Sequence, residues 1–137
     1  MVRTICVQSL HDARAALTAA AALGCPVTLI SAPAAAAHGG CGWFRAMIAA
    51  AAVERPEITV TAVLDCADLP GLVLAGVRAG VDHLRFSGRK VVAARLSAIA
   101  GAAGVRLYDA DAFAGPQLDL RGVGDPVAAC RAWLSHT

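Results

Sequence analysis

Hydrophobic and polar residues follow two different spacings along this chain. Short runs rich in valine, isoleucine and threonine lie between turn residues, which is typical of β-strands, and longer alanine-rich segments that end at glycine or proline are typical of helices. The short runs predict five strands, over residues 3–8, 27–31, 58–64, 82–86 and 105–108. The longer segments predict five helices, over residues 11–23, 42–54, 69–79, 90–103 and 125–135. Residues 117–120 also alternate and are a candidate for an additional short edge strand.

The regular alternation of strands and helices predicts a single α/β domain over residues 1–137, with a five-stranded parallel sheet and right-handed crossovers. We expect a three-layer sandwich with the flavodoxin-like strand order 2-1-3-4-5, and the Rossmann-like order 3-2-1-4-5 is the second choice. The segment AGVDHLRFSG, residues 79–88, is also similar to a piece of a (β/α)8 barrel. Because 137 residues are too few to close such a barrel, we expect this similarity to be local.

The composition of the chain bears on its partners and its location. Apolar residues make up 58% of the chain and charged residues 16%, so we expect some apolar surface to be buried in a homodimer. The net charge of +2 and the aromatic content of 4% argue against a nucleic-acid partner. Residues 15–44 carry no charged Lys, Arg, Asp or Glu, but prolines and glycines interrupt this segment before it reaches membrane-spanning length. We therefore expect a cytoplasmic protein without a membrane segment.

The cysteines argue against two kinds of site. The five of them are odd in number and form no CxxC pair: Cys6, Cys25, Cys41, Cys66 and Cys130. A disulfide framework or a zinc site of familiar spacing is therefore not expected. The chain also has no GxGxxG or P-loop lysine motif, so we expect neither a metal nor a cofactor.

The first candidate site is the sequence HGGCGWF, residues 38–44, between the second predicted strand and the second predicted helix. Glycines such as Gly40 free the backbone to turn its N–H groups toward an anion, and the start of the helix adds positive potential. A cysteine at a helix start has a lowered pKa, so Cys41 is a candidate nucleophile with His38 as its base. Alternatively, the glycines only form a tight loop and Cys41 is an ordinary helix-start residue.

Two aromatic residues, Trp43 and Phe44, begin a helix that otherwise consists mainly of small and aliphatic residues. Consecutive residues in a helix point about 100° apart, so one core cannot easily take both rings. We expect one ring to pack in the core, and Trp43 or Phe44 to lie at or near the interface of the homodimer.

The second candidate site is the sequence DCAD, residues 65–68, after the third predicted strand. Asp65 resembles the phospho-acceptor of response-regulator receiver domains, and Ser87 matches the small hydroxyl residue that these domains carry after the fourth strand. The chain departs from the receiver pattern, because residues 9–12 read SLHD instead of an acidic pair and residues 108–109 read YD where receivers have a lysine. The resemblance implies a flavodoxin-like fold without phosphotransfer. Alternatively, Asp65 forms hydrogen bonds in a turn or at a helix start.

The third candidate site is Ser87-Gly88-Arg89-Lys90, after the fourth predicted strand. A hydroxyl group, a flexible glycine and two cations at a helix start suit a phosphate or a carboxylate. Alternatively, the segment is an ordinary helix start with solvated cations. Parallel strands end at one edge of a sheet, and the residues that we expect to bind a ligand there are Ser9, Gly40, Cys41, Asp65, Ser87 and Arg89.

The spaced sequences GWF, LDC and AGVDHLRFSG are also similar to those of small uncharacterised bacterial α/β proteins, which have no established activity. This resemblance implies no site residues, and two functions stay open. The first is a non-catalytic, oligomeric α/β protein that binds a small anionic ligand at the carboxyl edge of its sheet. The second is an enzyme acting on a small phosphorylated or carboxylated metabolite, with Asp65 as acid or base and Arg89 as an anion clamp.

Overall fold

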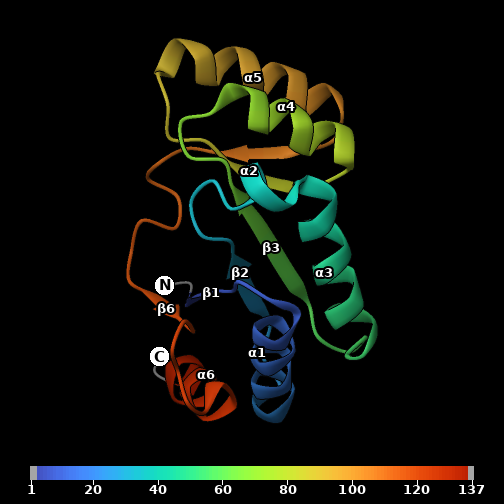
Figure 1. Ribbon diagram of the computed structural model, residues 1–137, viewed down its shortest axis with the longest axis vertical. Coiled ribbons are helices and arrows are strands. Elements are labelled where there is room, and N and C mark those ends of the chain that lie inside the picture. The colour runs from blue at the N-terminus through green and yellow to red at the C-terminus, as the bar shows by residue number, and fades with distance from the viewer. Residues whose placement is uncertain (1–2, 136–137) are drawn as a thin grey trace.

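The computed structural model describes residues 3–135, and a parallel β-sheet lies at its centre (Figure 1). The strands are β1 (Thr4–Cys6), β2 (Val27–Ile30), β3 (Val60–Asp65), β4 (His83–Arg85), β5 (Arg106–Tyr108) and β6 (Gln117–Asp119). The helices are α1 (Leu10–Leu23), α2 (Ala36–Gly39), α3 (Cys41–Val53), α4 (Pro70–Ala79), α5 (Lys90–Ala102) and α6 (Pro126–Ser135). Within residues 3–135, no helix combines the length and the apolar character needed to cross a membrane.

The strands pair in the order β5-β4-β3-β2-β1-β6, and every pair is parallel. The α/β class with a parallel sheet is therefore confirmed. The expected flavodoxin-like and Rossmann-like orders are wrong, and the candidate segment 117–120 supplies a sixth strand, β6. Both expected orders need the chain to reverse its direction across the sheet, whereas every step from β1 to β5 goes to the next neighbour in one direction. The spacing of apolar residues contains no signal for that direction.

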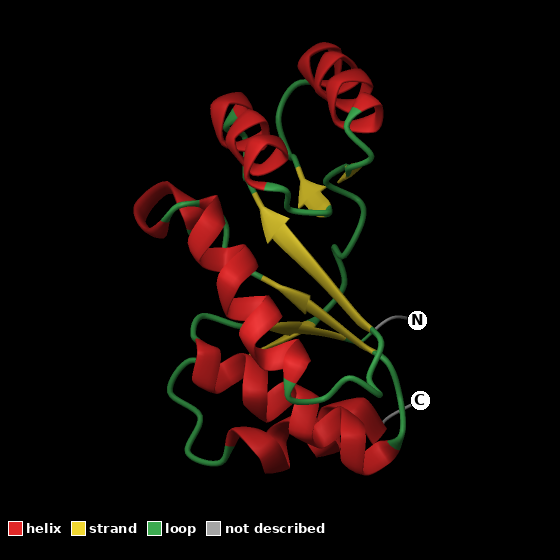
Figure 2. Cartoon of the chain, turned by 90° about the vertical axis from the view of Figure 1, so that its right-hand side faces the viewer, coloured by secondary structure: helices red, strands yellow, loops and turns green. Residues whose placement is uncertain are grey.

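The helices follow one another around the outside of the curved sheet (Figures 1 and 2). Successive right-handed crossovers in one direction place their helices on the same face of a sheet. In agreement with this, α1 packs against α3, α3 against α4, and α4 against α5, while α6 packs against α1. These helices pack against one another along the face of the sheet that carries the main hydrophobic core.

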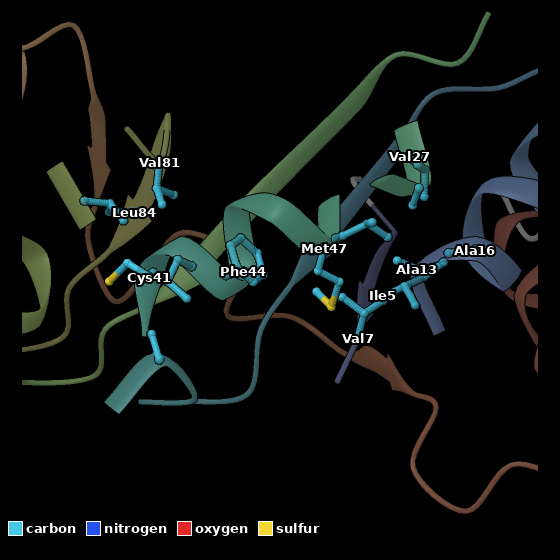
Figure 3. Close-up of a cluster of buried hydrophobic side chains, with 14 of the residues drawn as sticks. Ile5, Val7, Ala13, Ala16, Val27, Cys41, Phe44, Met47, Val81 and Leu84 are labelled. Atoms are coloured by element: carbon cyan, nitrogen blue, oxygen red, sulfur yellow. The ribbon is translucent and has the colours of Figure 1, made fainter. Parts of the chain in front are cut away.

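The main hydrophobic core lies between the sheet and these helices. Alternate strand residues point into it, among them Ile5, Leu29, Leu64 and Leu84. The helices contribute buried side chains that include Ala16, Leu17, Phe44, Met47, Val73, Leu96 and Cys130. Figure 3 shows Phe44 and Met47 of α3 within this cluster. Many of the buried helix residues are alanines, so the helices approach the sheet closely.

The concave face of the sheet carries a smaller buried cluster of Cys6, Ile30 and Val63. A segment that we call the strap, residues 109–116, joins β5 to β6, which lie at opposite edges of the sheet. The strap runs over the concave face between these edges and contains a turn at residues 110–113, where the N–H of Ala112 donates to the carbonyl oxygen of Asp109. Its Phe113 packs on the buried cluster of the concave face.

Candidate functional site

The carboxyl ends of β3, β4 and β5 bring three polar residues into one row. Asp65, the last residue of β3, pairs in register with Arg85, the last residue of β4. Arg85 in turn pairs in register with Tyr108, the last residue of β5. The row lies at the edge of the sheet where open parallel α/β folds bind their ligands.

Asp65 and Arg85 form a buried ion pair in which Arg85 Nη1 donates to Asp65 Oδ2 over 3.0 Å. Their side chains are only 4% and 15% exposed, respectively. Asp65 Oδ1 accepts a hydrogen bond of 2.9 Å from the N–H of Ala67. Both carboxylate oxygens are thus engaged, as burial of a charge requires. This geometry fits the structural alternative for Asp65, a turn hydrogen bond, better than a free acid or base.

Arg85 is the residue of this region that sequence reasoning misses. The strand expected over residues 82–86 places it inside a strand, and the expected site begins two residues later, at Ser87. The sequence does contain a signal, because a carboxylate ends one strand and a cation of opposite charge lies near the end of the next. Strand register is needed to turn that signal into a contact.

A hollow of about 480 Å³ opens between the loops that follow β3 and β4. This volume lies within the usual range for a small-molecule site. The residues that line it are Asp68, Pro70, Phe86, Ser87, Gly88, Arg89 and Val92. Of the expected ligand residues, Ser87 and Arg89 line this hollow, and Asp68 lines it with them.

The floor of the hollow explains why residue 88 is a glycine. A Cβ atom on Gly88 would lie 2.3 Å from Cζ of the buried Phe86 ring, so the loop passes directly over that ring. The N–H of Ser87 donates to the carbonyl oxygen of Ala67 over 2.8 Å and joins the two loops. This arrangement fixes the position of Arg89 at the start of α5.

The start of α5 carries positive charge and has no acidic residue in its first turn. The first N–H groups of a helix have no partner within the helix, and Arg89 at the N-cap position makes no capping hydrogen bond with its side chain. The first turn holds no acidic residue and begins with Lys90. Within residues 3–135, the ion pairs involve neither Arg89 nor Lys90. Helix dipole and side-chain charge therefore have the same sign here, which favours an anion.

The remaining expected ligand residues do not line this hollow. Ser9 caps α1, where its Oγ accepts a hydrogen bond of 3.2 Å from the N–H of Asp12. Gly40 has a φ of +83° and joins α2 to α3, a conformation that favours glycine. Cys41 is buried in the core, and its Sγ lies 3.8 Å from the carbonyl oxygen of Leu72.

The expected lowered pKa of Cys41 is wrong. Burial raises the pKa of this thiol, and the nearby positive charge of Arg78 opposes the shift only in part. The expected base, His38, is exposed on α2. Cys41 is therefore a core residue and not an activated nucleophile.

The two aromatic residues at the start of α3 point in different directions, as expected. Phe44 is 1% exposed and belongs to the core, whereas Trp43 is 39% exposed. The Trp43 ring covers Gly39 of α2, where an added Cβ would lie 3.2 Å from it. Of the two residues, Trp43 is the one that reaches the surface, so the interface prediction now concerns Trp43.

Comparisons with known proteins support the fold and leave the chemistry open. No protein-family model matches the chain, and no curated protein sequence is similar to it. Among solved structures, the chain is similar to a crystal structure from Coccidioides immitis described as a candidate fructose-1,6-biphosphate aldolase, with a TM-score of 0.67 and 21% identity. The match covers 79% of this chain and 40% of that chain, so this chain spans about two fifths of its length. At this identity the likeness shows the fold alone, which here means parallel strands paired in chain order.

Proposed function

We propose that this is a non-catalytic, oligomeric α/β protein that binds a small anion at the carboxyl edge of its sheet. The binding place is the hollow lined by Ser87, Gly88 and Arg89 at the start of α5. One observation carries the proposal: two cations without an ion-pair partner among the described residues, Arg89 and Lys90, stand at the positive end of a helix beside this hollow. Each such charge is unfavourable by roughly 0.3–1 kcal/mol at this end of a helix, and a bound anion would offset that cost.

The hollow also suggests the size and type of the anion. Ser87 offers a hydroxyl group, and the first turn of α5 offers backbone N–H groups, so a phosphate or a carboxylate would find several donors. Asp68, which also lines the hollow, favours a ligand that carries a hydroxyl or amino group as well. A small phosphorylated or carboxylated metabolite combines these features.

The enzyme alternative assigns Asp65 the role of acid or base. Its carboxylate is 4% exposed, and both oxygens are bonded to Arg85 and Ala67. A general base needs to reach the proton that it removes. This geometry favours binding over catalysis.

The proposal includes a homodimer in the cytoplasm. Trp43 on α3 is partly exposed, and the exposed residues Gly42 and Ala46 near it are small, which allows another helix to approach closely. Tryptophan is enriched among the residues at the centre of protein interfaces that contribute most to the binding energy.

A thermal-shift titration with inorganic phosphate, and then with small phosphorylated and carboxylated metabolites, tests the binding proposal. We expect at least one anion to raise the melting temperature of the wild type. Arg89→Ala should weaken this binding by on the order of 2 kcal/mol, as for the loss of a charge-assisted hydrogen bond. Arg95→Ala, an exposed change later in α5, is the matched control and should behave as the wild type. Equal stabilisation of wild type and Arg89→Ala would contradict the proposal.

A further inference from the structure

One nitrogen of the Arg85 guanidinium group has no hydrogen-bond partner among the described residues. Its Nη1 donates to Asp65, and its Nη2 donates to the carbonyl oxygen of Ala110 in the strap over 2.7 Å. Its Nε is buried and makes no hydrogen bond with any of residues 3–135. Nε and Nη2 share one edge of the planar guanidinium group, and such an edge fits the two oxygens of a carboxylate. The strap therefore supplies one oxygen where a carboxylate would supply two.

The strap also places an aromatic side chain, that of Phe113, on the concave face of the sheet. Phe113 packs on Cys6, Ile30 and Val63, and its ring meets the Tyr108 ring edge-on with centroids 4.9 Å apart. Tyr108 pairs in register with Arg85, so the Phe113 ring contacts the direct strand neighbour of Arg85.

Phe113 holds this position in a strained backbone conformation. Its φ is +61°, in the left-handed region that a bulky side chain rarely adopts. Such strain persists where the surroundings impose it, and it is concentrated at functional segments. The hydrogen bond from Gln117 Nε2 to the Phe113 carbonyl oxygen, 3.1 Å, helps to hold the residue in place.

We propose that the concave face of the sheet is a second binding site, for a small aromatic carboxylate, and that the strap covers it. The carboxylate would take the Nε/Nη2 edge of Arg85 from the Ala110 carbonyl, and the aromatic ring would replace Phe113 on Cys6, Ile30 and Val63. The site differs from the hollow at Arg89, and its occupant needs no contact with α5.

Benzoate is the probe for this site, and alkylation of Cys6 reports its position. Cys6 belongs to the buried cluster against which Phe113 packs, so we expect a bound benzoate to slow the reaction of Cys6 with N-ethylmaleimide, which peptide mass spectrometry follows. Phe113→Gly removes the covering ring and relieves the strain. It should raise the affinity for benzoate by about tenfold, because a larger share of the molecules is then open to the ligand. Ala114→Gly loosens the strap without removing the ring and should change the affinity much less.

Arg85→Lys separates the carboxylate contact from the stability of the fold. A lysine keeps a positive charge beside Asp65 but has no guanidinium edge, so benzoate binding should fall by at least about tenfold. Arg95→Lys, an exposed change on α5, is the matched control and should bind as the wild type. Arg89→Ala should leave benzoate binding unchanged, so this test and the phosphate test fail independently. Unchanged Cys6 protection, unchanged affinity in Phe113→Gly, or wild-type binding by Arg85→Lys would each overturn the proposal.

Discussion

Asp65 and Arg85 face each other across β3 and β4, with Oδ2 and Nη1 3.0 Å apart, and together they fasten the strap to the sheet. Removing one partner of such a buried pair leaves a charge without compensation, which typically costs about 3–5 kcal/mol. We expect Asp65→Ala to lower the free energy of unfolding by about this amount in urea denaturation.

The exposed ion pair between Arg14 and Glu54, 2.8 Å long, is the control for this prediction. Both side chains are about half exposed, and such a pair contributes roughly 0–1 kcal/mol. Glu54→Ala should therefore change stability little. Equal effects of Asp65→Ala and Glu54→Ala would show that the buried pair has no special role.

The close packing of α4 on β4 predicts opposite effects of two similar substitutions. A Cβ atom on Gly76 would lie 2.7 Å from Leu84 Cδ2, so Gly76→Ala should destabilise the protein by about 1–3 kcal/mol. Gly101 in α5 has no atom within 4 Å of the same position, and Gly101→Ala should stabilise by roughly 0.5–1 kcal/mol. Thermal unfolding of the two variants measures the difference. A neutral Gly76→Ala would contradict the close approach of helix and strand.

Buried thiols predict a loss of stability in alkali. Burial is the main cause that raises the pKa of Cys66 to about 12 and the pKa values of Cys6 and Cys130 to about 11, from an ordinary value of 9.0. A raised pKa favours the protonated native state, so this stability is present below pH 9 and falls as pH rises toward 11 or 12. The slope is about 1.4 kcal/mol per pH unit for each thiol. Denaturation at several pH values should show the fall, and Cys130→Ala should make it shallower. The same slope in both proteins would contradict the assignment.

The proposed dimer interface predicts that Trp43→Ala weakens association. Loss of a central aromatic side chain typically costs an interface 2 kcal/mol or more, roughly a thirtyfold change in dissociation constant. Light scattering over a concentration series measures the effect, and Val91→Ala, an exposed apolar change on α5, is the control. A wild type that is monomeric at micromolar concentration would end the dimer proposal.

The positions of most strands and helices could be predicted from the sequence, because they depend on local residue spacing. The strand expected over 58–64 is observed as Val60–Asp65, and the strand expected over 105–108 as Arg106–Tyr108. The strand order could not be predicted, because both a reversing and a non-reversing chain satisfy the same apolar pattern. The similarity to a barrel piece was expected to be local, at residues 79–88. In the structure the strand order that it implies extends further, since β1 to β5 pair in chain order.

The candidate site could be predicted only in part. Ser87 and Arg89 follow one strand closely, and they line one hollow. Cys41 was expected beside a ligand, but it begins the buried face of α3 that continues through Phe44, Met47 and Ala51. That spacing of three to four residues is visible in the sequence and indicates a core position. The contact of Arg85 with the strap could not be predicted, because Arg85 and Ala110 are separated by 25 positions in the chain and the sequence gives no sign of their contact.

Phosphate titration followed by nuclear magnetic resonance of the backbone amides tests the central claim most directly. If phosphate binds in the hollow at the start of α5, the largest shifts will be those of the N–H groups of residues 87–92, and they will be lost in Arg89→Ala but not in Arg95→Ala. Shifts spread evenly over the surface, or no shifts at residues 87–92, would contradict the account.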